Sequence, residues 1–291
     1  MARSPSIWSA GKKITKIRAM TGKLNKTRLA RRLGIARATL YYRSRKKEPD
    51  EADKKLIEAV MDSNHSYGHK RIAPALKMNK KKVLRIMHKY GLKPKISRFK
   101  RPGKPGDRNK PTALYDNVVY KMCPLKPNVV WCGDFTYIRF RNSFVYLATV
   151  LDLFTKEIIG ASISAWHSQH LVKTALEDAV KTRGGLPKYF HSDQGSEYQA
   201  EAHAEYLTKQ GVTVSMSKKS SPWQNGCQES FYSQFKLELG ETRNYETTGH
   251  LAEAIYRQLH YYNQQRIHSN FKMPPARFRQ LCESRSYGLT V

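Results

Sequence analysis

The chain has 291 residues, with 53 Lys and Arg against 23 Asp and Glu, which gives a formal net charge of +30. A charge this large repels itself in a compact fold and favours a polyanionic partner. Hydrophobic residues make up 40% of the chain and aromatic residues 11%, a composition that excludes global disorder. The length predicts two domains, or one large domain with a small attachment.

The positive charge is concentrated in the first third of the chain. Residues 1–110 hold 33 Lys and Arg and 7 Asp and Glu, a balance of +26, whereas residues 111–291 hold 20 and 16, a balance of +4. This asymmetry predicts a basic segment that binds nucleic acid, followed by a nearly neutral body. A merely exposed, solubilising basic face is the less favoured alternative.

The cysteine and hydropathy patterns exclude further classes. The four cysteines form no CxxC pair, which argues against a disulfide scaffold or a Cys-rich zinc module and favours a reducing compartment. No apolar run reaches the length of about 18 residues that a membrane span needs. The basic N-terminus is not followed by the apolar segment of a signal peptide, so we expect none.

The segment 24–43 (LNKTRLARRLGIARATLYYR) has a helix-turn-helix pattern. Leu29 and Leu33 lie four residues apart, and Gly34 supplies the turn. Arg37 and Thr39 are then placed at the start of the second helix, where they can reach a DNA major groove. Similar helical hairpins also occur in proteins that bind no DNA.

A second helical segment follows, with Asn79 as an N-cap and Gly91 as a helix end. Its helices are predicted over 51–62, 67–72 and 79–91. Lys80, Lys81 and Lys82 occupy a first helical turn, where the helix dipole disfavours cations. We interpret these lysines as phosphate contacts, with a solvated turn as the alternative.

Residues 93–110 (KPKISRFKRPGKPGDRNK) are rich in Pro, Gly and basic residues and are typical of an extended cationic linker that can follow a phosphate backbone. The linker marks the main domain boundary. We therefore expect two helix-turn-helix segments, a basic linker and an α/β core with C-terminal helices, over residues 1–48, 49–92, 93–125 and 126–285.

Beyond the linker the pattern changes to short apolar strands. Three strands with short links predict an antiparallel meander, and later strands alternate with helices. The order βββαβαβα predicts an α/β fold with a mixed sheet flanked by helices. Strands are expected over 129–138, 144–153, 158–165, 189–193 and 212–216, and helices over 169–182, about 200–210 and around Glu229.

Three acids occupy comparable positions in this order: Asp134 in the first strand, Asp193 at the end of the fourth, and Glu229 on the helix after the fifth. A mixed sheet can bring a strand centre, a neighbouring strand end and a covering helix together. Clustered carboxylates bind Mg²⁺ or Mn²⁺, and two such ions can activate an attacking oxygen and stabilise the leaving oxygen of a phosphodiester.

The helix that carries Glu229 is amphipathic. Cys227, Phe231 and Phe235 share one apolar face, and Glu229 and Lys236 share the opposite face. Lys236 can therefore hold a DNA phosphate while Glu229 holds metal. An ordinary surface helix with a charged outer face is the alternative.

Other polar residues near these acids have simpler interpretations. Asp152 is expected to cap a turn, and Glu197 to lie in a loop or at a helix start. His191 lies two residues before Asp193 and points to the same face, either supporting the acid or serving as a structural histidine.

Five motifs resemble those of insertion-sequence transposases with a triad of two Asp and one Glu. Three are residues 131–138 (WCGDFTYI), 191–198 (HSDQGSEY) and 225–238 (NGCQESFYSQFKLE), with 35 residues between Asp193 and Glu229. Residues 67–72 (YGHKRI) and 262–274 (YNQQRIHSNFKMP) are similar to segments that flank the core in the IS-three family. One departure is Gln224 followed by Asn225, where the family often has Asp-Asn.

This resemblance implies an RNase H-like core shared with retroviral integrases. It implies that Asp134, Asp193 and Glu229 form the metal-binding catalytic triad, and that Lys236 contacts the transposon end. Arg266 and His268 match residues that are expected to contact DNA. The implied partners are transposon ends and target DNA, a second copy of the chain, and a product of an upstream reading frame. The implied location is the bacterial cytoplasm, on the nucleoid when DNA is bound.

The sequence therefore predicts a transposase that cleaves DNA at element ends and transfers strands, using two Mg²⁺ or Mn²⁺ ions. A metal-dependent nuclease of RNase H type, without strand transfer, is one alternative. A catalytically silent DNA-binding regulator is the other. The basic front segment argues against the first, and the presence of all three acids argues against the second.

Overall fold

The computed structural model describes residues 28, 31, 34, 36, 47–95, 115–120, 122–199, 201–218 and 222–287. The chain forms two compact units, residues 1–55 and residues 56–291. Arg37 and Thr39 of the first helix-turn-helix pattern lie outside the described residues. The division into four segments stays a prediction.

Three helices precede the sheet: α4 (Lys47–Ser63), α5 (His69–Ala75) and α6 (Lys80–Tyr90). The side chain of Asn79 accepts a hydrogen bond from Lys81 N at 2.8 Å, and Gly91 ends α6 at a φ of 71°, a left-handed conformation that glycine adopts without strain. Both features confirm the predicted ends of this helix. The helices share a small apolar core of Ile57, Tyr67, Ile72, Ala73, Val83, Ile86 and Met87.

The main body is built on a five-stranded mixed sheet in the order β3-β2-β1-β4-β5. The antiparallel meander comprises β1 (Val130–Phe140), β2 (Ser143–Asp152) and β3 (Ile158–Ser164). The parallel half comprises β4 (Tyr189–Ser192) and β5 (Thr213–Met216). This is the predicted RNase H-like arrangement. β4 pairs with β1 only at Val130, Trp131 and Cys132, so the described part of β1 beyond Cys132 has no strand on that side.

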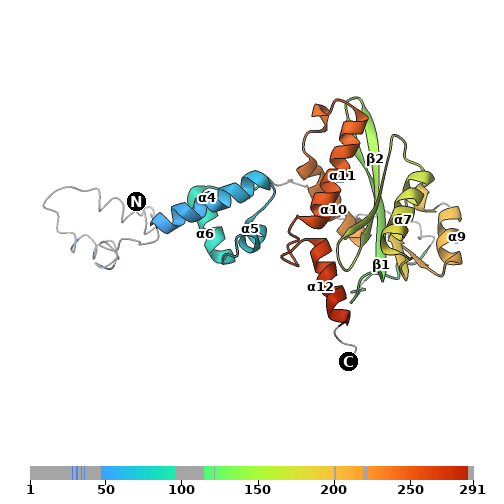
Figure 1. The fold of residues 1–291 in the computed structure, drawn as a ribbon, viewed down its shortest axis with the longest axis horizontal. Helices are drawn as coiled ribbons and strands as arrows, with labels where there is room; N and C mark the ends of the chain where they lie inside the picture. Colours follow the sequence, from blue (N-terminus) through green and yellow to red (C-terminus); the bar gives the residue numbers. More distant parts are fainter. Residues whose placement is uncertain are drawn as a thin grey trace, which may run out of the picture. The chain divides into compact units, whose positions relative to one another are not determined.

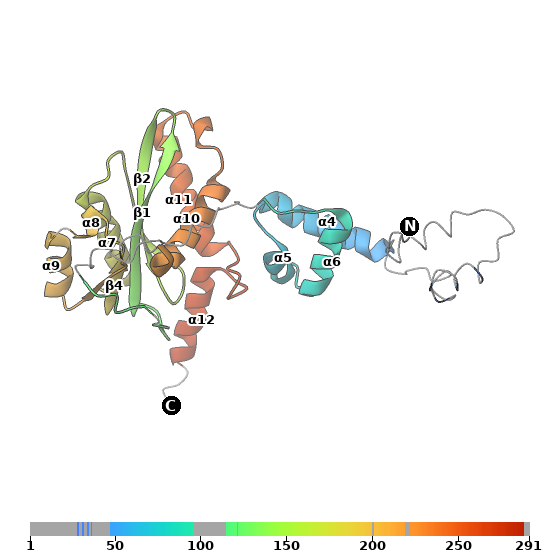
Figure 2. The same cartoon turned by 180° about the vertical axis from the view of Figure 1, so that it is seen from behind.

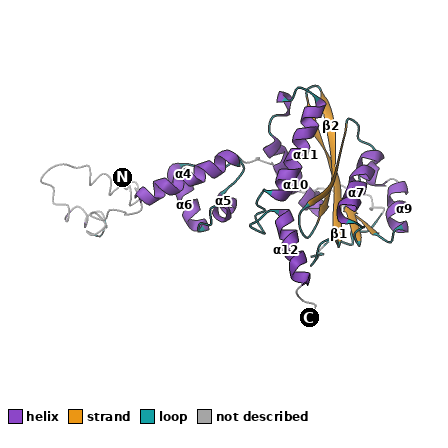
Figure 3. Cartoon of the chain, viewed as in Figure 1, coloured by secondary structure: helices purple, strands orange, loops and turns teal. Residues whose placement is uncertain are grey.

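Helices cover both faces of the sheet (Figures 1 and 2). One face carries α7 (Gln169–Arg183), α8 (Ser196–Gln199) and α9 (Glu201–Lys209), and the other carries α10 (Gly226–Leu239) and α11 (Thr248–Gln264). Short 3₁₀ turns at Pro222–Asn225 and Thr242–Asn244 flank α10, and α12 (Pro275–Tyr287) follows α11. Colouring by secondary structure shows the sheet between these helical layers (Figure 3).

The two faces are packed differently. Against α7, a Cβ placed on Gly160 would lie 2.2 Å from the carbonyl oxygen of Ala175, so this close approach of helix and strand requires glycine. Against α10 and α11, Phe231 and Phe235 are buried with Ile138, Leu147 and other apolar residues. Full burial of a phenylalanine contributes roughly 1.5–3 kcal/mol to stability.

Within the described residues, every helix is too short or too polar to span a bilayer.

Candidate active site

Asp134 lies near the middle of β1, opposite Thr149 of β2. Its Oδ1 accepts a hydrogen bond from the amide of Phe135 at 2.8 Å. The Asp134 carbonyl accepts a hydrogen bond at 2.7 Å from the hydroxyl of Tyr232, a buried residue of α10. The backbone that carries the carboxyl is therefore fixed from the helix above it.

Asp193 is the first residue after β4, where the chain leaves the sheet. Its Oδ1 accepts a hydrogen bond from the amide of Gly195 at 2.9 Å. A Cβ on Gly195 would lie 3.1 Å from Asp193 Oδ1 and 3.3 Å from Glu197 Oε2. Glycine therefore leaves room for the two carboxylates on either side of it.

Glu229 lies exposed in the first turn of α10, and its neighbour Gln228 anchors that helix to the sheet. Gln228 is completely buried. Its Nε2 donates hydrogen bonds to the carbonyls of Cys132 at 2.6 Å and Thr149 at 3.2 Å, and its Oε1 accepts one from Thr149 Oγ1 at 3.2 Å. Gln228 thus joins β1, β2 and α10 one residue before the predicted catalytic acid.

The charges of Asp193 and Glu229 act on Asp134. Burial raises the pKa of Asp134 well above its usual range, and the negative charges of Asp193 and Glu229 raise it further. Burial also raises the pKa of Asp193 and of Glu229. Among the described residues, no group of three or more His, Cys, Asp or Glu side chains is placed so that it could hold a metal ion. The three acids supply hard oxygen ligands, which Mg²⁺ and Mn²⁺ prefer. Lys236 is a cation near Asp134, and its charge lowers the pKa of that carboxyl.

Asp134 and Glu229 line a pocket of about 500 Å³ together with Lys236. This confirms the predicted arrangement of Glu229 and Lys236 on one side of their helix. Lys236 Nζ lies 4.8 Å from the centre of the Tyr137 ring, and burial lowers the pKa of the lysine. The other lining residues are Phe135, Thr136, Gly226, Ser230, Tyr232 and Ser233.

The neighbouring polar residues adopt the simpler roles. Asp152 accepts hydrogen bonds from the amides of Phe154 and Thr155, so it caps a turn as predicted. Glu197 lies in the first turn of α8 and pairs with Nδ1 of His167 at 2.7 Å. Buried His191 lies within hydrogen-bonding distance of two serine hydroxyls, and burial lowers its pKa to about 4.

Asp193, Arg266 and His268 do not line the pocket of Asp134 and Glu229. Arg266 is only 2% exposed, and its Nε donates to both carboxylate oxygens of Glu238 at 2.8 Å. This burial gives no support to a direct DNA contact by Arg266. His268 lines a second pocket behind α10. Lys80, Lys81 and Lys82 are exposed on α6, and their contact with DNA stays a prediction.

Gln228, Tyr232, Tyr137 and His167 were not identified as site residues from the sequence. Gln228 and Tyr232 are four residues apart on α10, a spacing that placed them together on one helical face. A glutamine and a tyrosine among apolar residues can indicate a buried hydrogen-bonding pair. The side-chain contacts of Tyr137 and His167 join residues distant in sequence and leave no local pattern.

The Integrase core domain family matches residues 124–222, and a second model with the same description matches residues 210–275. The chain is 33% identical over 231 residues to the transposase for insertion sequence element IS904 of Lactococcus lactis, covering 75% of this chain and 90% of that protein. It is 28% identical over 230 residues to transposase InsF for insertion sequence IS3A of Escherichia coli, covering 75% and 77%.

Among solved structures, the integrase catalytic core domain of HTLV-2 in complex with magnesium is similar, with a TM-score of 0.45 and 19% identity, over 53% of this chain and 98% of that one. The sequence comparisons identify the family, and the sheet order agrees with it. The chain belongs to the insertion-sequence transposases that carry an integrase core domain.

Proposed function

We propose that this chain cleaves DNA at the ends of its insertion sequence and joins those ends to target DNA, with Asp134, Asp193 and Glu229 as the catalytic triad. The observation that carries the proposal is that Asp134 of a strand centre and Glu229 of a helix line one pocket, while the charges of Glu229 and of Asp193, at a strand end, both raise the pKa of Asp134. Acids that lie close enough to repel one another favour the binding of a divalent cation, which offsets that repulsion.

The three carboxylates would hold Mg²⁺ or Mn²⁺, with two ions per site. Bound metal would supply Lewis acidity for the attacking and leaving oxygens of a phosphodiester. The attacking group is a water or a DNA 3′-hydroxyl, so no nucleophile from the protein is required. In this scheme Lys236 binds a phosphate beside the acids, Tyr232 fixes the backbone of Asp134, and Gln228 fixes the helix of Glu229.

The proposed partners are the transposon ends, the target DNA and further copies of the chain on that DNA. Arg37, Thr39 and the exposed lysines 80–82 are proposed contacts outside the catalytic pocket. A product of an upstream reading frame is a further proposed partner. The nearly neutral body and strongly basic first third support a division between catalysis and DNA capture.

The proposal is tested with Asp134→Asn, Asp193→Asn and Glu229→Gln. Each change keeps the side-chain shape but removes the negative charge, so cleavage and strand transfer should fall by about 1,000-fold or more. DNA affinity should remain within about twofold, since the acids oppose rather than attract phosphate. The measurement is cleavage and joining of labelled terminal-repeat DNA in Mg²⁺, with DNA binding measured separately.

Glu205→Gln is the matched control, because Glu205 is exposed on α9 and pairs with Lys209. It should leave both activities unchanged. A triad variant with full strand transfer would remove that residue from the triad. Cleavage without any joined product would favour the nuclease alternative.

A further inference from the structure

A second pocket of about 330 Å³ lies behind the catalytic helix. Gly226 and Ser230 of α10 line both this pocket and the pocket of Asp134 and Glu229, so the two pockets are neighbours on either side of one helical turn. The remaining lining combines cationic and polar side chains with apolar ones. It comprises Arg71, Leu151, Lys156, Cys227, Phe231, Gln234, Tyr262, Arg266, His268, Ser269 and Asn270.

The charges around this second pocket are unbalanced. Arg71, Lys156 and Arg266 are cationic, and Glu238 pairs with Arg266. Among the ion pairs of the described residues, none involves Arg71 or Lys156. Burial lowers the pKa of Arg71, the charge of Arg266 lowers it further, and the charge of Glu238 acts in the opposite direction. The site is therefore short of negative charge.

His268 lies near the same positive charges. Burial lowers its pKa to about 4, and Arg266, Lys156 and Arg71 all contribute in that direction. In the described structure its buried Nδ1 has no hydrogen-bond partner. The backbone of His268 is fixed by an antiparallel bridge to Met273. The His268 ring therefore has a nitrogen, Nδ1, that is free for a hydrogen bond in the described structure and lies near the cationic side chains.

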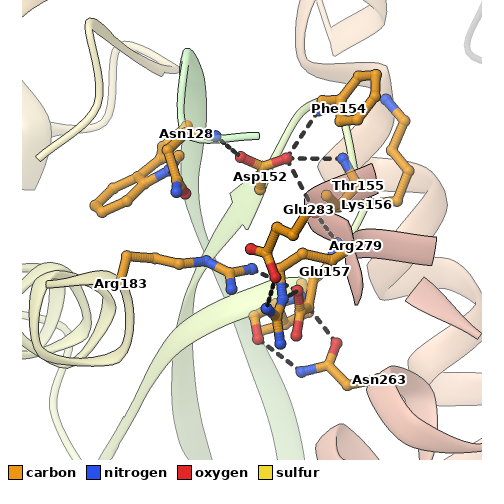
Figure 4. A network of polar contacts seen from close by, with 12 residues as sticks. Asn128, Asp152, Phe154, Thr155, Lys156, Glu157, Arg183, Asn263, Arg279 and Glu283 are labelled. Atoms are coloured by element: carbon orange, nitrogen blue, oxygen red, sulfur yellow. Dashed lines mark hydrogen bonds and ion pairs between the residues drawn. The ribbon is translucent and has the colours of Figure 1, made fainter. Parts of the chain in front are cut away.

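Lys156 is held in place by the turn that carries it. It adopts a φ of 61°, a left-handed conformation that is uncommon outside glycine and costs energy. In the same turn, Asp152 accepts hydrogen bonds from the amides of Asn128 and Thr155 (Figure 4). The Tyr262 hydroxyl also donates to the Lys156 carbonyl at 3.0 Å.

The other end of the same turn is fixed equally firmly. Glu157 is buried and pairs with Arg183 of α7 and Arg279 of α12 (Figure 4). Asn263 of α11 donates to the carbonyl of Ile158 at 2.7 Å and accepts from its amide at 3.0 Å. These contacts tie three helices to one turn, and Lys156 Nζ is left 3.2 Å from the weak acceptor Cys227 Sγ.

We propose that this second pocket binds one backbone phosphate of the DNA whose neighbouring segment occupies the pocket of Asp134 and Glu229. The phosphate would be contacted by Lys156, Arg71 and His268. Arg266, which is paired with Glu238, would contribute to the positive potential without direct contact. A phosphate supplies the negative charge that the pocket lacks and hydrogen-bond acceptors for its donors. The choice of DNA over a free anion rests on the proposed function and on the residues that the two pockets share.

The first arm of the test uses sodium sulfate as a probe on the full chain carrying Asp134→Asn, which prevents cleavage. Sulfate at about a hundredfold excess over its Kd should raise Tm by roughly 5 °C above sodium chloride at equal ionic strength. Lys156→Gln should lose this shift. Lys209→Gln, which removes an exposed lysine of α9, should keep it.

The second arm uses duplex DNA that carries the element's terminal repeat. Lys156→Gln should weaken binding by about tenfold and reduce the slope of log affinity against log salt by about 0.9, the value expected for one lost phosphate contact. Lys209→Gln should change neither quantity. His268→Asn serves as a second variant if Lys156→Gln unfolds. The sulfate-induced rise in Tm can also be measured with the pocket residues unchanged.

A sulfate shift without any change in DNA binding would overturn the assignment to DNA and identify a pocket for free anions. The absence of both effects would overturn the site altogether. DNA binding through Lys156 in a chain that never cleaves would instead contradict the proposed function and leave this pocket in place.

Discussion

The buried imidazole of His203 makes the stability of the core depend on pH. Its ring lies 5.6 Å from the rings of both Phe190 and Tyr198, and in the described structure its Nε2 has no hydrogen-bond partner. Burial lowers its pKa from 6.5 to about 4. Between these values the unfolded chain binds more protons than the folded one, so stability is complete above about pH 6.5 and is lost as pH falls towards 4.

We predict that His203→Phe reduces this acid sensitivity. The substitution should remove a loss in the free energy of unfolding on the order of 1 kcal/mol per pH unit below pH 6.5. Urea unfolding at pH 5 and pH 7 measures the difference. His260→Phe, at an exposed position on α11, is the control that should retain the sensitivity of the unsubstituted chain. Equal sensitivity in the two variants would show that His203 is not the group responsible.

At the scale of the element, α10 depends on one buried amide for its position. Gln228→Leu would leave the carbonyls of Cys132 and Thr149 without their donor, at a cost of roughly 2–4 kcal/mol. The helix would also lose the contact next to Glu229, so we predict that cleavage falls more than DNA binding does. Chemical denaturation and a cleavage assay measure the two effects.

Gln169→Leu is the control for Gln228→Leu, because it is the same change at an exposed position at the start of α7. It should change stability by less than about 0.5 kcal/mol. Normal cleavage by a destabilised Gln228→Leu protein would show that the helix is positioned by its apolar contacts alone.

The elements of the core were predictable because their signals are local. Apolar runs identified all five strands, and the spacing of Phe231 and Phe235 oriented α10 with Glu229 on the other side. The same reasoning could not find the partner of Arg266, because Glu238 lies 28 residues away and meets it only in the folded chain. The basic pocket was missed for this reason, since its residues come from α5, a turn, α10 and the segment after α11.

At the scale of the whole molecule, the charge is divided between regions with different tasks. The body from residue 111 onward has a balance of +4 and contains the three acids, which repel phosphate unless a cation lies between them. In the proposed function, local basic sites such as Lys236 and the pocket around Lys156 would position the DNA beside the acids. Long-range attraction would come from the rest of the chain, whose balance is +26.

Removing residues 1–46 tests this division, because they contain 14 Lys and Arg and no Asp or Glu. We predict that the shortened chain binds duplex DNA more weakly at low salt, with a shallower fall of log affinity against log salt, since each lost phosphate contact reduces the slope by about 0.9. DNA supplied at saturating concentration should still be cleaved, because the triad and the contacts of Gln228 lie outside the deleted segment. An unchanged slope would contradict a role for this segment in binding DNA. It would instead indicate that the lysines of α6 and the linker attract the DNA.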